Sequence, residues 1–186
     1  MHTLMRLVSG LLLVLWPFLV WYSLTHPQAL WLLPLLVLMF ALRWLALRHQ
    51  QGAMAAAGKW LAVTGALLCG VSLLLRDRHL LLWYPVAVNA ILLLLFFASL
   101  FSPMPLVERL ARLREAELPP QAVAYTRRVT QVWCLFFVLN GGVALTTCLI
   151  NSLYLWTLWN GMLSYGLMGL LMLCEWLLRQ RIRRRG

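Results

Sequence analysis

The chain alternates between long apolar runs and short polar turns, with one longer polar interval in its second half. Six apolar runs cover about residues 5–23, 29–47, 57–75, 80–101, 129–150 and 157–178. The hydrocarbon core of a bilayer is about 30 Å thick, so a helix that crosses it needs roughly 20 mostly apolar residues. The pattern therefore predicts an all-α polytopic membrane protein. Its six transmembrane helices would form a single integral membrane domain that comprises residues 1–186.

The polar interval at 102–131 separates the fourth run from the fifth, and we expect residues 102–128 to form a cytoplasmic interfacial segment. Its first half has apolar residues at helical spacing and charged residues on the opposite side. The apolar residues are Leu106, Val107, Leu110 and Leu113, and the charged residues are Glu108, Arg109, Arg112 and Glu115. This pattern predicts a short amphipathic helix that lies in the membrane interface. The following helix is expected to begin near Pro120, since proline suits the first turn of a helix.

The third apolar run contains a small residue at every fourth position. These small residues are Gly58, Ala62, Ala66 and Gly70. Small side chains along one face let a neighbouring helix approach closely, so we expect a helix-packing face here. The alternative is that the same face forms a groove for a lipid chain.

Composition supports the membrane interpretation. Hydrophobic residues make up 63% of the chain and charged residues 11%, and the mean hydropathy is +0.82. A soluble domain does not have this balance. The net charge of +11 would suggest nucleic-acid binding in a soluble protein. Here the basic residues flank the apolar runs, so we expect contact with anionic lipids and no nucleic-acid partner.

The distribution of the basic residues predicts the orientation of the chain. If the N-terminus lies in the cytoplasm, fourteen Lys and Arg residues fall in cytoplasmic segments, and only Arg76 and Arg78 fall on the other side. Cytoplasmic segments of membrane proteins carry an excess of basic residues, so both termini are expected in the cytoplasm. Nine of the ten tryptophans fall near the ends of the apolar runs, as expected for residues that prefer the membrane interface.

Glu175 is the only acidic residue inside an apolar run, and Arg43 lies at a similar depth in the second run. A charge at membrane depth needs a partner, so we expect these two side chains to pair across the bundle. Arg179, one helical turn from Glu175, offers a second partner. The alternative is that Glu175 binds a substrate or a proton.

Three asparagines lie at membrane depth, namely Asn89, Asn140 and Asn160. Such residues either line a polar cavity or hydrogen-bond between helices, and the second is the more common. We therefore expect an intramembrane polar network that joins helices.

The sequence lacks the motifs of known catalytic sites. It has no phosphate-binding glycine loop and no HExxH or GxSxG motif, and its cysteines form no CxxC pair. The sequence thus predicts no catalytic residues, no cofactor and no metal site, which argues against an enzyme. A membrane-bound acyl- or glycosyltransferase is the alternative within the enzyme class.

Two stretches carry a resemblance to a known family. They are PMPLVERLARLREAELPPQAVAYTRRVTQVWCLFFVLNGG at 103–142 and EWLLRQRIRRR at 175–185. With them, the chain resembles a family of small uncharacterised bacterial integral membrane proteins. Members of that family occur in gene clusters for aryl polyene or xanthomonadin-type pigment biosynthesis, near acyl carrier proteins and ketosynthases. The resemblance implies the inner membrane of a Gram-negative bacterium and a role in making or delivering a polyene lipid, and it carries over no catalytic residue.

The basic cytoplasmic face suggests a partner. Its candidate contact residues are Arg109, Arg112, Arg127, Arg128, Arg181, Arg183, Arg184 and Arg185. Acyl carrier proteins are typically acidic, and complementary charge would attract them to a basic membrane surface. We therefore expect a membrane adaptor for soluble acyl carrier or synthase proteins. The alternatives are that these residues only fix topology and bind anionic lipid, or that the protein is a transporter or flippase component for a lipid-like product.

Overall fold

The computed structural model of the chain describes residues 15–26, 28–113 and 119–183, apart from the side chains of Leu30 and of residues 181–183. In these ranges the fold is all-helical and contains no strand. A first helix covers residues 15–25. It is followed by η1 (Ala29–Trp31), α2 (Leu32–Leu47), α3 (Ala53–Leu75), η2 (Arg78–Trp83), α4 (Tyr84–Ser99), α5 (Leu106–Arg112), α6 (Pro120–Ile150), α7 (Leu153–Leu158), the π-helical turn η3 (Trp159–Leu163) and α8 (Ser164–Arg183).

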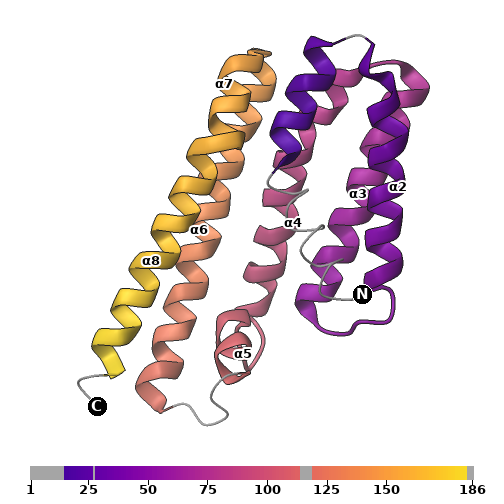
Figure 1. The fold of residues 1–186 in the computed structure, drawn as a ribbon. Helices are drawn as coiled ribbons and strands as arrows, with labels where there is room; N and C mark the ends of the chain where they lie inside the picture. Colours follow the sequence, from indigo (N-terminus) through magenta and orange to yellow (C-terminus); the bar gives the residue numbers. More distant parts are fainter. Residues whose placement is uncertain (1–14, 27, 114–118, 184–186) are drawn as a thin grey trace.

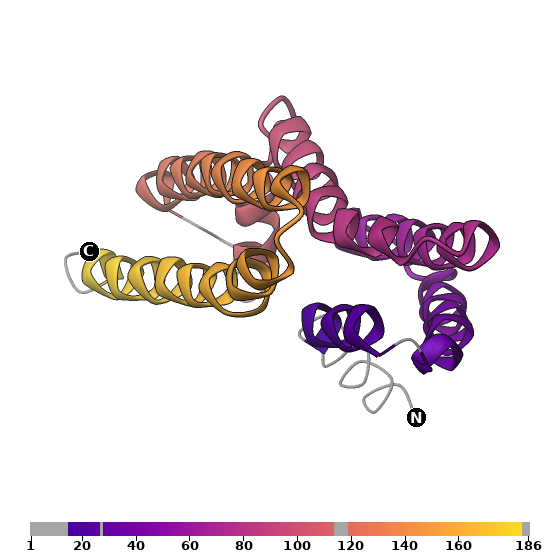
Figure 2. The same cartoon turned by 90° about the horizontal axis from the view of Figure 1, so that it is seen from above.

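The long helices run up and down and form an open bundle (Figures 1 and 2). α4 lies between α3 on one side and α6 on the other, and α8 runs beside α6 at the far edge. One end of the bundle holds residues 48–52, α5, the start of α6 and the last turns of α8 (Figure 1). We call this the basic end, because seven of the basic residues gather there. They are Arg48, Lys59, Arg109, Arg112, Arg127, Arg128 and Arg179.

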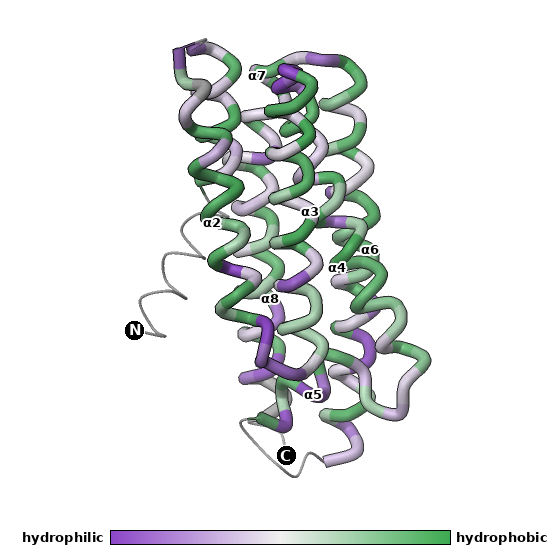
Figure 3. Tube along the Cα trace, turned by 90° about the vertical axis from the view of Figure 1, so that its right-hand side faces the viewer, coloured by the Kyte–Doolittle hydropathy of each residue, from purple (hydrophilic) through white to green (hydrophobic). Residues whose placement is uncertain are grey.

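Four helical stretches are long and apolar enough to cross a membrane. They are Ala53–Leu75, Arg78–Ser99, Pro120–Ile150 and Leu153–Gln180, with 23, 22, 31 and 28 residues. They correspond to the last four of the six expected spans, and hydropathy along the chain is highest between the two ends (Figure 3). α2 is apolar but has only 16 residues. Residues 5–14 of the first expected span lie outside the described residues.

α3 and α6 are each followed by a residue with left-handed backbone angles and then by a capping side chain. Arg76 directly follows α3 and Asn151 directly follows α6, and both residues have left-handed backbone angles, with φ of 55° and 56°. A capping side chain follows in each case, because Asp77 accepts a bond from the His79 amide and Ser152 accepts one from the Leu155 amide. α6 begins with Pro120 in its first turn, as the sequence predicted.

Two clusters of buried side chains form the core. The larger joins the helix at 15–25 to α2, α3, η2, α4 and α7, and its members include Trp16, Phe40, Ala62, Tyr84 and Trp156. The smaller lies near the basic end and holds Phe96, Leu106, Cys134 and Phe137. This second cluster fixes α5 against the ends of α4 and α6.

The packing face of α3 differs from the expected one. Gly58 and Ala62 are buried as predicted, and Ala66 is partly buried. Gly70 has open space around its backbone, and the close contact is made instead at Gly65, where a Cβ atom would overlap the Phe40 ring. A spacing of four residues advances 400° around a helix with 3.6 residues per turn, so the stripe rotates away from α2 along its length.

We expect Gly65→Ala to lower the melting temperature of the protein in detergent, because the added methyl group displaces a Phe40 ring that Trp16 and Tyr84 already hold. Overpacking of this kind costs about 1–3 kcal/mol. Gly70→Ala is the matched control, and it should leave the melting temperature unchanged or raise it, since alanine is the better helix former. Equal effects of the two substitutions would contradict the packing described here.

Candidate functional site: the basic end and the buried polar contacts

α5 is held at the basic end by buried contacts from its first residue. The side chain of Leu106 is buried in the smaller core cluster, and its amide donates to Ser99 Oγ at 3.0 Å. Ser99 lies in the last turn of α4 and donates in turn to the Phe96 carbonyl at 2.6 Å. The start of α5 is therefore tied to the end of α4 both by apolar packing and by hydrogen bonds.

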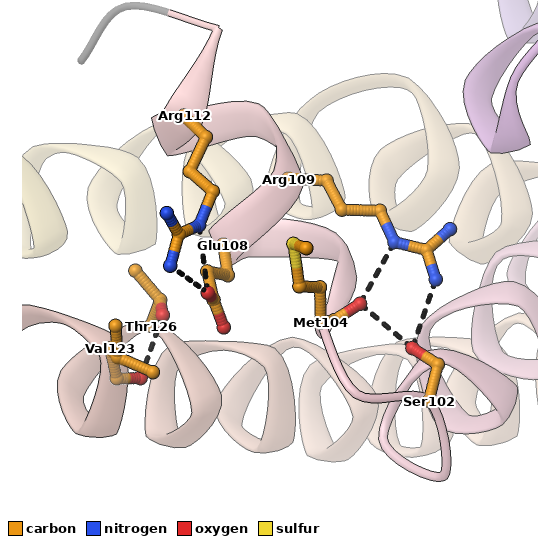
Figure 4. Close-up of polar contacts among 7 residues, drawn as sticks. All are labelled: Ser102, Met104, Glu108, Arg109, Arg112, Val123 and Thr126. Atoms are coloured by element: carbon orange, nitrogen blue, oxygen red, sulfur yellow. Dashed lines mark hydrogen bonds and ion pairs between the residues drawn. The ribbon is translucent and has the colours of Figure 1, made fainter. Parts of the chain in front are cut away.

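Glu108 is turned into the protein, contrary to the expectation that it lies on the polar outer side of the helix. Its side chain is 3% exposed, and one carboxylate oxygen pairs with Arg112 Nη2 at 2.8 Å and Nε at 2.9 Å (Figure 4). The other oxygen, Oε2, is buried and has no hydrogen-bond partner in the described residues. A buried carboxylate is tolerated here because a guanidinium one turn away neutralises it.

The apolar residues in the second half of α5 face outward, whereas Leu106 at its start is buried. Leu110 and Leu113 are exposed, Leu113 at 82%, whereas Ala111 is buried beside Glu108. The sequence predicted apolar and charged residues on opposite sides of this helix, and the structure adds that Glu108 and Ala111 are the buried members of α5 after Leu106.

Arg109 and Arg127 donate hydrogen bonds to backbone carbonyls of the turn between α4 and α5. Arg109 donates from Nε to the Met104 carbonyl at 2.8 Å and from Nη2 to Ser102 Oγ at 2.9 Å (Figure 4). Arg127 donates to the Leu100 carbonyl at 2.9 Å. Carbonyls at the end of a helix lack partners and carry partial negative charge, so cations bind there favourably. The sequence did not indicate that Arg109 and Arg127 would bind backbone carbonyls in this turn.

Lys59 does the same for the neighbouring turn at the basic end. Its Nζ donates to the Arg48 carbonyl at 3.0 Å and to the Gln50 carbonyl at 2.9 Å. Arg128 is exposed on α6 and leaves its charge available at the surface. The side chains of Arg181 and Arg183, and the whole of Arg184 and Arg185, lie outside the described residues.

The asparagine network joins α4 to α6 and then to η3. Asn140 donates from Nδ2 to Asn89 Oδ1 at 3.0 Å, and both residues are buried. The Asn140 Oδ1 atom accepts from Trp159 Nε1 at 3.1 Å, and Asn89 Nδ2 donates to the Pro85 carbonyl at 2.8 Å. Two of the three predicted asparagines are thus brought together as an interhelical contact.

Asn160 is buried too, but it donates to the Trp156 carbonyl in the preceding turn rather than to the other asparagines. Trp156 is fully buried, and its Nε1 donates to the Leu82 carbonyl at 3.0 Å. Trp156 and Trp159 thus both make hydrogen bonds between segments of the chain, a role that the sequence did not indicate. Both indoles lie beside the π-helical turn Trp159–Leu163, a rare geometry that is often found at functional sites.

Arg43 and Glu175 are not brought together. Arg43 lies on α2 and Glu175 on α8, and these helices occupy opposite sides of the bundle (Figures 1 and 2). Glu175 is only half-buried, and its backbone carbonyl accepts a bond from the Tyr125 hydroxyl at 3.2 Å. The pairing was predicted from the similar depth of the two residues, but other helices lie between α2 and α8.

Comparison of the chain with protein-family models, with curated protein sequences and with solved structures finds no match. The functional interpretation therefore depends on the residues described above.

We expect Glu108→Ala to loosen α5. The substitution removes the ion-pair partner of Arg112 and the buried group that faces α6, and such a loss costs about 1–3 kcal/mol. Backbone amides of residues 106–112 should then exchange faster with deuterium. Glu175→Ala serves as the control and should leave exchange in this segment unchanged. Unaltered exchange after Glu108→Ala would show that the carboxylate does not anchor the helix.

We expect Asn140→Ala to lower the melting temperature more than Asn160→Ala. The first substitution removes the contacts to both Asn89 and Trp159, and interhelical hydrogen bonds in membrane proteins contribute about 0.6 kcal/mol on average and up to about 1.7 kcal/mol. The second removes only a bond within one helical segment. The reverse order of the two melting temperatures would contradict the network.

Proposed function

We propose that this protein is an inner-membrane adaptor that holds an acidic soluble protein at the cytoplasmic surface of a bacterial membrane. In this proposal the chain crosses the membrane six times, and both termini and the basic end lie in the cytoplasm. The partner is an acyl carrier protein or a synthase subunit, as the resemblance to the polyene-associated family suggests. The protein itself performs no catalytic step.

The observation that carries this proposal is the ordered arrangement of cations at the basic end. Arg109 and Arg127 are exposed yet fixed by bonds to main-chain carbonyls or a serine, while Arg128 projects from α6 beside them. Fixed cations lose little conformational freedom when an acidic surface binds, so they suit a docking surface better than freely moving side chains do. At the opposite end of the bundle, Arg76 and Arg78 are the only lysine or arginine residues in the part of the chain that the structure describes.

The outward-facing leucines at the end of α5 support the same proposal. An interfacial helix with exposed Leu110 and Leu113 places its apolar side in the acyl chain region and keeps the neighbouring arginines at the water surface. Such a helix would hold the docking cations at a constant height above the bilayer. A soluble synthase recruited there would release an apolar product beside the membrane.

The test is crosslinking in native membranes at low and high salt, followed by identification of the captured proteins. We expect acyl carrier protein or synthase subunits to be captured at low salt and lost at high salt, because salt screens exposed charges. Arg128→Glu should reduce capture severalfold, since Arg128 makes none of the turn contacts described above. Arg76→Glu, at the opposite end, is the matched control.

Capture of no soluble partner at either salt concentration would contradict the adaptor. Equal losses with Arg128→Glu and Arg76→Glu would contradict the location of the docking surface. Charge reversal at Arg109, Arg112 or Arg127 is less informative, because each of these side chains also stabilises α5 or its turn.

A transporter or flippase component for a lipid-like product is the second candidate, favoured by the half-buried Glu175 on α8. A membrane-embedded carboxylate can carry a proton or contact a polar headgroup. Glu175→Gln should then abolish export of the product while its synthesis continues. The adaptor proposal expects neither export nor synthesis to change in this variant.

A further inference from the structure

Three side chains with hydrogen-bond donors lie near the Phe40 ring in the larger core cluster or one turn from it. They are Trp16 in the first helix, Arg43 in α2 and Tyr84 at the start of α4, and we call them the interior donor cluster. The Trp16 and Tyr84 rings are in contact, with centroids 4.5 Å apart, and Phe40 packs on both at 5.5 Å. Arg43 lies one turn along α2 from Phe40, on the same side of the helix, and its side chain is partly buried.

Two of these donors lack partners. Trp16 is 3% exposed and Tyr84 1%, and neither Trp16 Nε1 nor the Tyr84 hydroxyl has a hydrogen-bond partner among the described residues. Burying an unsatisfied polar group is unfavourable, so native proteins leave few of them and each one calls for an explanation. Here two such unsatisfied donors lie on rings that contact each other. This arrangement indicates a place where a bound molecule supplies the missing hydrogen-bond acceptors.

The chemistry of the donors defines that molecule. An indole N–H and a guanidinium only donate, and a phenol hydroxyl can donate, so the molecule must accept several hydrogen bonds. The local charge is positive, because residues 15–25, α2 and α4 contain Arg43 but no aspartate or glutamate. An oxyanion meets both requirements, and guanidinium groups bind carboxylates and phosphates in this way.

The surroundings define the rest of the molecule. The donors sit among the apolar side chains of the larger core cluster, and Arg43 is only partly buried. The same core cluster includes Trp156 of α7, so the donors lie between the two sides of the bundle. Binding sites between the helices of a bundle are typically apolar with a few convergent polar groups.

We propose that the interior donor cluster binds the anionic headgroup of an apolar molecule dissolved in the bilayer, with a carboxylate or phosphate at Trp16, Arg43 and Tyr84 and the apolar chain between the helices. This site is separate from the docking surface at the basic end. It gives the protein a second activity, the binding of an acidic lipid-like molecule, which does not depend on a soluble partner.

The test uses the full chain in vesicles of neutral phosphatidylcholine at alkaline pH. The probes are a photoactivatable palmitic acid and the corresponding fatty alcohol, which differ only in the headgroup. We expect the acid to label the protein about tenfold more strongly than the alcohol, with the labelled residues in the first helix, α2 or α4. Equal labelling by acid and alcohol would overturn the proposal, since water or any polar group would then satisfy the donors.

Tyr84→Phe is the decisive variant, because it removes only the hydroxyl and keeps the ring that packs on Trp16 and Phe40. It should lower labelling by the acid severalfold and leave labelling by the alcohol unchanged. Tyr154→Phe, at a tyrosine that is 74% exposed, is the matched control and should label like the unmodified protein. Unchanged acid labelling after Tyr84→Phe would overturn the proposal.

Competition identifies the headgroup. Unlabelled palmitate should displace the probe if the site takes a carboxylate, and phosphatidic acid should displace it if the site takes a phosphate. Displacement by neither would show nonspecific labelling and overturn the proposal. Loss of acid labelling in Tyr84→Phe with intact capture of a soluble partner would separate this site from the adaptor activity.

Discussion

The hydrogen bond from Asn140 to Asn89 joins α4 and α6 among apolar side chains, and much of the structure depends on the closeness of these two helices. Gly141 permits it, because a Cβ atom there would lie 3.0 Å from Asn89 Cβ. The same Asn140 accepts a bond from Trp159, which links the pair to η3 and the start of α8. In an apolar medium the hydrophobic effect does not drive helices together, so close packing and interhelical hydrogen bonds take its place.

The α4–α6 pair also creates the support for α5. The smaller core cluster joins the end of α4 and the middle of α6 to the first residue of α5, and the buried Glu108 lies two residues further along α5. The arginines of this region therefore have two roles. Arg109, Arg112 and Arg127 stabilise the turn and the ion pair, and the charge that they bring to the surface is a consequence of the same contacts. A substitution at any of these three arginines would therefore change the surface charge and the local structure together.

The sequence was sufficient to predict the helical class, the last four apolar spans and the start of α6, because these depend on long-range averages of hydropathy and on local residues such as Pro120 and Asn151. It also indicated that asparagines would join helices. Which side of a helix meets its neighbour depends on contacts between distant segments. Periodicity therefore did not show that Glu108 is turned into the protein, and it favoured Gly70 over Gly65.

The candidate site was less predictable for the same reason. Arg43 and Glu175 match in depth, but a linear sequence does not show the order of helices around the bundle. Trp156 and Trp159 have the spacing of interfacial residues, and only the positions of Leu82 and Asn140 reveal their structural role. The unsatisfied donors of Trp16 and Tyr84 have no sequence signal, because the lack of a partner is a property of the packed interior.

The orientation of the basic end is the claim on which the adaptor depends, and labelling of single cysteines tests it most directly. Cysteines would replace the exposed Gln50, Gln121 and Gln28 one at a time, in a chain without its four native cysteines. A maleimide that does not cross membranes should label positions 50 and 121 only in inverted vesicles, and position 28 only from the periplasmic side. Labelling of positions 50 and 121 from the periplasmic side would contradict the account.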